Sequence, residues 1–65
     1  MKLHPPTPIG SLGIGVPFVK DNRNYYRSFS APFDQVIAYE VFNRVVQFKD
    51  PIYFDKNDLV QPLVI

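Results

Sequence analysis

The residues of this chain that could carry out chemistry are one histidine, His4, together with serines and a few carboxylates. A Ser-His-Asp arrangement can be assembled on paper from His4, Ser28 or Ser30 and an aspartate. His4, however, stands in the proline-rich stretch "MKLHPPTP", which offers no rigid scaffold. Catalysis requires groups held to a fraction of an ångström by packed neighbours. We therefore predict that the chain is not an enzyme.

The sequence also contains few residues that could form a metal or cofactor site. The chain has no cysteine, which removes disulfides and thiolate ligands. The stretch "DKNDLVQP" begins like a calcium loop, but Leu59 and Val60 occupy the fifth and sixth positions, where an EF-hand needs an oxygen ligand and glycine. The glycines of "GSLGIGVPF" lack the preceding strand and following helix of a phosphate loop. We predict no cofactor and no bound metal.

A cluster of cations and aromatic rings in "VKDNRNYYRSFS" suggests a nucleic-acid contact. The candidate residues are Lys20, Arg23, Tyr25 and Arg27. On a strand, Tyr25, Arg27 and Phe29 would share one face, as in a stacking platform for bases. Cross-strand aromatic packing produces the same pattern, and a net charge of +1 gives no basic excess. We therefore favour an ordinary hairpin over nucleic-acid binding.

Charge is distributed unevenly along the chain. Residues 1–33 carry four cations and one acid, a balance of +3, whereas residues 34–65 carry three cations and five acids, a balance of −2. This polarity suits head-to-tail contacts between copies or with a neighbouring chain. The first residues contain no apolar signal-peptide core, and no run approaches the ~18 apolar residues that cross a bilayer. We expect neither a signal peptide nor a membrane partner.

These groups are predicted to be positioned by an α+β fold. Residues 1–12 form an extended, Pro-rich arm, and residues 13–65 form a single small domain. One β-hairpin is expected for "VPFVK" and "YYRSFS" around the turn "DNRN". A second hairpin is expected for "IYF" and "LVQPLVI" around "DKND", with Pro62 restricting the last run to an edge position.

A central amphipathic helix is predicted at about 32–48. The polar residues Glu40, Asn43, Arg44 and Gln47 follow the i, i+3, i+4, i+7 spacing of a helix stripe. Pro32 fits a first helical turn and Pro51 ends the segment. The β-branched residues of this segment prefer strands, which leaves an all-β alternative open.

The predicted helix would be apolar over about 260° of its circumference, more than two hairpins can cover. Part of that surface is therefore expected to face other protein chains. A stiff proline arm and an apolar C-terminus would add to this interface. The predicted interface residues are Val36, Tyr39, Phe42, Val45, Val46, Leu63, Val64, Ile65, Pro5 and Pro6.

The stretch "LGIGVPF", the aromatic strand with "SFS" and the acid-led segment from "FDQVI" together resemble the N-terminal part of the baseplate wedge proteins of contractile-tailed bacteriophages. The similarity covers about residues 13–48. After the helix that family has a Pro-Gly-Glu-Arg-like turn and a larger α/β body, whereas this chain has "DPIY". The resemblance implies a part of a virion that works by docking.

Together these features predict a non-enzymatic structural or assembly protein, a virion component of tail, baseplate or capsid type that docks neighbouring subunits as a homo- or hetero-oligomer. Its expected location is the virion or the host cytoplasm. Two alternatives stay open: a small nucleic-acid-binding module that uses the Tyr/Arg hairpin, and a small regulator that binds one host protein.

Overall fold

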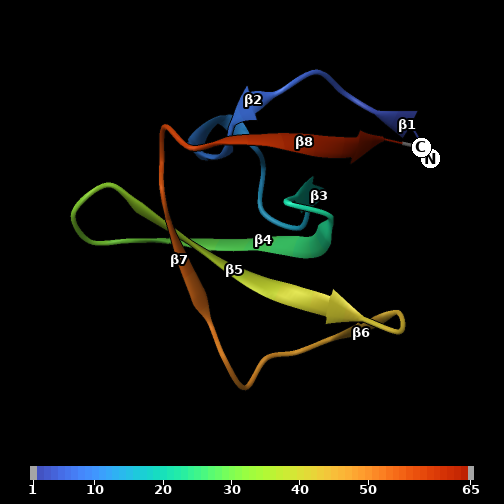
Figure 1. Cartoon of the computed structure of the whole chain (residues 1–65). Coiled ribbons are helices and arrows are strands. Elements are labelled where there is room, and N and C mark those ends of the chain that lie inside the picture. The colour runs from blue at the N-terminus through green and yellow to red at the C-terminus, as the bar shows by residue number, and fades with distance from the viewer. Residues whose placement is uncertain (1, 65) are drawn as a thin grey trace.

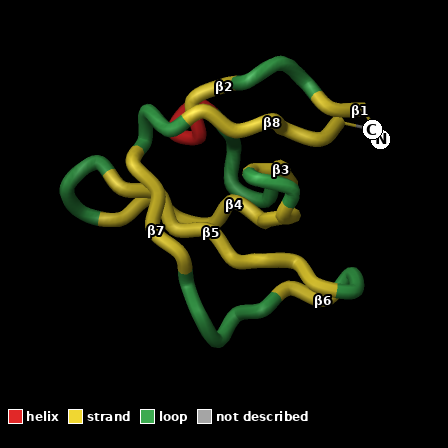
Figure 2. The backbone as a smooth tube through the Cα atoms, viewed as in Figure 1, coloured by secondary structure: helices red, strands yellow, loops and turns green. Residues whose placement is uncertain are grey.

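The chain is nearly all β in the computed structural model, which describes the backbone of residues 2–64 and the side chains of residues 2–63 (Figure 1). Strands make up 58% of it and form one antiparallel sheet. The strands are β1 (Lys2–Leu3), β2 (Thr7–Pro8), β3 (Pro17–Lys20), β4 (Arg23–Ala31), β5 (Gln35–Phe42), β6 (Val45–Val46), β7 (Ile52–Asp55) and β8 (Leu59–Val64). A single 3-10 turn, η1 (Ile9–Ser11), follows β2 (Figure 2).

The predicted α+β fold with a central helix at 32–48 is wrong. That segment forms β5 and the β5–β6 hairpin. Its β-branched and aromatic residues alternate between the two faces of the sheet, and this preference outweighs the helical spacing of the polar residues. Asn43 and Arg44, two members of the apparent polar stripe, are instead the two turn residues of the hairpin, with φ of 51° and 64°.

The sheet has the strand order β1-β8-β3-β4-β5-β6. Each outer edge is a broken strand, because β1 and β2 pair with successive parts of β8, while β6 and β7 pair with opposite halves of β5. After β7 the chain turns and re-enters the far side of the sheet as β8 (Figure 1). The sheet is therefore bent back over its own interior.

Of the two predicted hairpins, one is present. β3 and β4 pair around a two-residue turn at Asp21 and Asn22, whose φ values of 52° and 63° match the type I′ turns that suit twisted hairpins. β7 and β8 are adjacent in sequence but pair with other strands, so the second hairpin is wrong. The prediction that Pro62 lies on an edge strand is also wrong, because β8 has neighbours on both sides.

The N-terminal segment is extended but does not project from the body. β1 and β2 pair with β8, and the N–H of His4 donates to the carbonyl of Pro62 at 2.8 Å. Ile9, at the start of η1, is fully buried. The predicted arm therefore contributes an edge strand and a core residue to the same unit as the rest of the chain.

The core is small. It consists of Ile9, Phe18, Tyr25, Val36, Ala38, Phe54 and Val60. Phe18 and Tyr25 stack with ring centroids 5.3 Å apart, and Phe54 meets both rings edge-on at 5.7 and 5.4 Å. These three rings join β3, β4 and β7 across the interior of the bent sheet.

Gly10 is the glycine on which chain packing depends most directly. Its N–H donates to the carbonyl of Lys56 at 2.9 Å, and a Cβ added to Gly10 would lie 2.9 Å from that same oxygen. Because this oxygen belongs to the backbone, the clash can be relieved only if η1 and the β7–β8 turn move apart.

We expect Gly10→Ala to lower the free energy of unfolding by about 1–3 kcal/mol, the usual cost of overpacking. Urea denaturation followed by circular dichroism measures the change. Gly13→Ala is the matched control, because its added methyl would meet the nearest atom, in Val16, at an ordinary 3.8 Å. Equal stability of the two variants would contradict this account of the η1 contact.

Candidate interaction surface

A β-bulge in β4 decides which side chains point outward. Pairing with β5 shifts between Arg27 and Ser30, so that Arg27 opposes Ala38 while Ser30 opposes Val36. Arg27 and Ser28 are consecutive and both buried, and Phe29 is then exposed. The prediction that Tyr25, Arg27 and Phe29 share one face is therefore wrong, because the extra residue turns Phe29 to the other side.

The outer side of β4, β5 and β7 carries a group of apolar and aromatic side chains. Directly paired residues share a face of the sheet, as do residues two apart on one strand. Tyr26 pairs with Tyr39, and Ile37 with Tyr53, opposite the buried pair of Val36 and Phe54. With the residues beside them these form the outer aromatic face, defined as Tyr26, Phe29, Ile37, Tyr39, Phe48 and Tyr53.

Phe48 joins this face from the loop after β6. Its ring lies 5.1 Å from that of Tyr39, at an interplanar angle of 61°. Phe29, Phe48 and Tyr53 are all more than half exposed. Such a concentration of accessible rings is unusual for a face that the protein's own core does not use.

The residues of the outer aromatic face are themselves uncharged, and Asp55, which pairs with Gln35, is an acid on the same side of the sheet at one end of this face. The outward positions of β5 are Gln35, Ile37, Tyr39 and Val41. Aromatic residues without lysine or acid are typical of the centre of protein–protein interfaces. Binding to nucleic acid instead depends on cations that neutralise phosphates. The chemistry of this face therefore suits an apolar protein surface.

The four residues predicted to contact nucleic acid do not form one surface. Tyr25 is in the core and Arg27 is only 5% exposed. The Nζ of Lys20 donates to the carbonyl of Leu59 at 3.2 Å, and Arg23 lies 3.8 Å from Glu40 in an exposed ion pair. The two buried residues cannot touch a nucleic acid in this fold, and the other two are held by their own chain.

Arg27 instead holds the bulge from inside. Its guanidinium donates to the carbonyl of Ser28 and to the hydroxyl of Ser30, the latter at 3.2 Å. Its Nε has no partner among the described residues, and no carboxylate there pairs with it. These two hydrogen bonds, to Ser28 and Ser30, hold in place the irregular backbone that turns Phe29 outward.

We expect Arg27→Ala to destabilise the isolated chain by about 2–4 kcal/mol, because it removes a buried stem and leaves the carbonyl of the buried Ser28 without its donor. Arg23→Ala, at an exposed ion pair, should cost less than about 0.5 kcal/mol. Thermal unfolding without nucleic acid compares the two variants. A neutral Arg27→Ala would show that Arg27 has no part in maintaining the bulge.

The predicted interface residues are scattered by the β fold. Val36 points into the core, and Tyr39 belongs to the outer aromatic face. The β5–β6 hairpin brings together Phe42, Val45 and Val46, of which the first two are exposed. Pro5 and Pro6 are exposed between β1 and β2, while Leu63 is half-buried on β8; the side chain of Val64 and all of Ile65 lie outside what the structure describes.

Tyr26, Phe29, Ile37 and Tyr53 are not among the interface residues predicted from the sequence. The alternation of Ile37, Tyr39 and Val41 was a signal for a strand whose outer face is apolar. The position of Phe29 had no such signal, because a bulge is set by pairing between strands.

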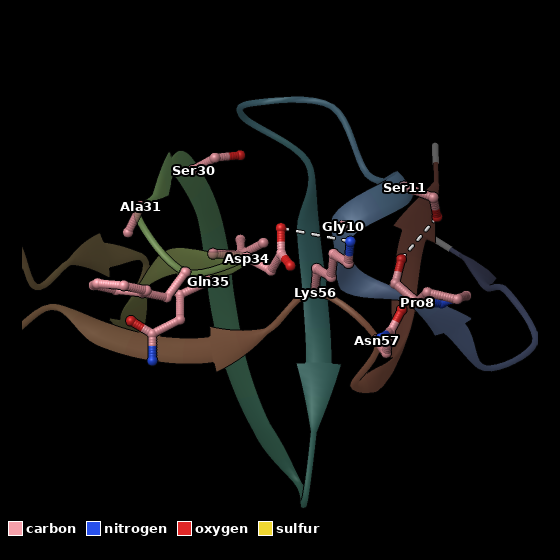
Figure 3. Close-up of a pocket in the computed structure, with 11 residues that line it drawn as sticks. Pro8, Gly10, Ser11, Ser30, Ala31, Asp34, Gln35, Lys56 and Asn57 are labelled. Atoms are coloured by element: carbon pink, nitrogen blue, oxygen red, sulfur yellow. Dashed lines mark hydrogen bonds and ion pairs between the residues drawn. The ribbon is translucent and has the colours of Figure 1, made fainter.

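A shallow cavity of about 560 Å³ lies between η1, the β4–β5 turn and the β7–β8 turn (Figure 3). Its polar groups largely bind one another. Lys56 pairs with Asp34 at 3.5 Å, and the hydroxyl of Ser11 donates to the carbonyl of Pro8 at 2.7 Å, as the dashed lines show. The described residues also contain no group of three or more potential metal ligands. This cavity offers little to a polar ligand.

Phe33 stands beside this cavity at the tip of the β4–β5 hairpin. It is 94% exposed and has a φ of 62°, followed by 59° at Asp34. A bulky residue with positive φ is strained, and Asn or Gly would adopt the same backbone more easily. Neither burial nor turn geometry explains a phenylalanine here.

Phe33→Asn is expected to raise the stability of the fold by about 1 kcal/mol, because it relieves left-handed strain without removing a buried side chain. Chemical denaturation of both proteins measures the difference. Phe33→Val is the control, since β-branching makes positive φ still less favourable. If Phe33→Asn destabilised the chain, the ring would have a packing role that its exposure does not show.

Comparison with protein-family models, curated proteins and solved structures finds no match to this chain. None of these comparisons links the chain to baseplate wedge proteins. The resemblance to that family therefore stays a prediction from short motifs. Within the described residues, no helix is long and apolar enough to cross a membrane.

Proposed function

We propose that this chain is a non-enzymatic protein-interaction domain that docks onto an apolar surface of another protein through the outer aromatic face. The observation that carries the proposal is the uncharged group of rings across β4, β5 and β7. A role as a structural part of a larger assembly, such as a virion, is the biological setting that the sequence motifs suggest.

The aromatic residues of this face lie where a partner protein could bury them. Large rings buried at an interface supply most of its binding energy, and such positions are rich in Tyr and other aromatic residues. Tyr26, Ile37 and Tyr39 are half-buried within the sheet and therefore already ordered. Docking onto them loses little side-chain entropy, which favours association.

Site-specific crosslinking tests the proposal. A photoreactive phenylalanine placed at Phe29 or Tyr53 should capture a defined protein in the native source, and the same probe at Leu59 should not. Leu59 is comparably exposed but lies on β8, away from the outer aromatic face. Capture of nucleic acid at these positions, or equal capture from all three, would refute the proposal.

Binding of the captured protein is then measured with both components purified. We expect Tyr53→Lys to weaken binding about 30-fold or more, corresponding to the ~2 kcal/mol of an interface hot spot. Leu59→Lys adds the same charge elsewhere and should leave affinity within about twofold. Unchanged affinity in Tyr53→Lys would remove Tyr53, and the centre of this face, from the interface.

A further inference from the structure

The two ends of β5 present opposite and matching features. The tip with Phe33 precedes the strand and the Asn43–Arg44 turn follows it, at opposite ends of the molecule (Figure 1). Eight strand residues separate them by about 26 Å at a rise of ~3.3 Å per residue. The molecule itself measures 31 Å along its longest axis.

At the far end from Phe33 the surface is hollowed. A mostly apolar cavity of about 280 Å³ lies there. Its lining residues are Pro17, Asn24, Tyr25, Val41, Asn43, Arg44 and Leu63. We call this cavity the end hollow. It joins the start of β3 to the end of β5, and it does not include the outer aromatic face.

Charge also differs between the two ends. Near the tip, Asp34, Asp55 and Asp58 outnumber Lys56, which leaves a net charge of −2. Beside the end hollow, Arg44 is exposed and forms no ion pair with any residue from 2 to 63. The tip therefore offers a ring next to the carboxylate of Asp34, which also lies 3.5 Å from Lys56 in an exposed ion pair, and the end hollow offers an apolar cavity next to the guanidinium of Arg44.

We propose that copies of this chain associate head to tail, with Phe33 of one copy inserted in the end hollow of the next and Asp34 paired with Arg44 across the contact. A carboxylate–guanidinium pair, for which Asp34 would exchange its exposed contact with Lys56, and the attraction of Arg44 to the ring would orient the insertion. The contact is heterologous, so repetition gives a ring or a filament. It uses a surface separate from the outer aromatic face and does not rest on the proposed function.

The self-association should be weak on its own. One aromatic side chain buries about 150–250 Å², far below the ~1,200 Å² of a stable interface. We therefore expect a weight-average mass that rises with concentration in sedimentation equilibrium. A mass of one chain at every concentration up to the solubility limit would overturn the proposal.

Two single substitutions block the two sides of the contact without harming the fold. Phe33→Asn removes the ring, and Arg44→Asp puts a carboxylate opposite those of the tip. Asn and Asp both tolerate the positive φ of these positions, so neither variant should be less stable than the parent. Each is expected to reduce the association constant at least tenfold. Sedimentation equilibrium measures this change as well.

Mixing the two variants distinguishes a head-to-tail contact from any symmetric one. Arg44→Asp keeps an intact tip and Phe33→Asn keeps an intact end hollow, so an equimolar mixture should form pairs of chains and nothing larger. A mixture that stays monomeric, or that assembles further, would overturn the proposed geometry.

Control variants distinguish this contact from self-association through other exposed residues. Ile14→Asn removes an exposed apolar side chain away from both ends of β5, and Lys49→Asp makes the same charge change as Arg44→Asp outside the end hollow. Both should associate like the parent. If Tyr53→Lys abolished self-association while Phe33→Asn did not, the outer aromatic face would be the self-contact and this inference would be wrong.

Discussion

The packing of Phe18, Tyr25 and Phe54 is the interaction on which this fold depends. Among the residues that the structure describes, β7 pairs with β5 alone, at the edge of the sheet farthest from β3. Nothing in the strand ladder therefore holds β7 beneath β3, and the edge-on contact of Phe54 with the stacked pair supplies that link. The hydrogen bonds from Ile9 to Asp58 and from Gly10 to Lys56, and the pairing of β8 with β3, support the same closure of the sheet.

A core this small limits what the chain can do alone. Domains of about 60 residues bury only about 60% of their unfolded surface and are marginally stable. Three of the ten aromatic residues are in the core, and the other seven are exposed or half-buried. These accessible rings do little for the stability of the isolated fold, and they are the residues on which the proposed docking surface is built.

Local signals predicted some elements and misassigned others. Asp21 and Asn22 adopt positive φ readily, and the β3–β4 hairpin was predicted from them. The helix prediction failed because Glu40 belongs to a strand while Asn43 and Arg44 form a tight turn, and a turn placed between strands imitates helical spacing. Pairing of β7 with β5 involves long-range contacts, which no local pattern encodes.

The candidate surfaces lie where the local rules of folding are broken. Phe33 adopts a backbone that suits Asn or Gly, and Arg27 places a cation in the interior without an acid. Arg27 has a structural reason, because its donors hold the bulge that exposes Phe29. For Phe33, the described residues of the chain give no such structural reason. Violations of local consistency persist where function compensates for them, and for this reason the proposed contact between copies is centred on the strained ring at the tip.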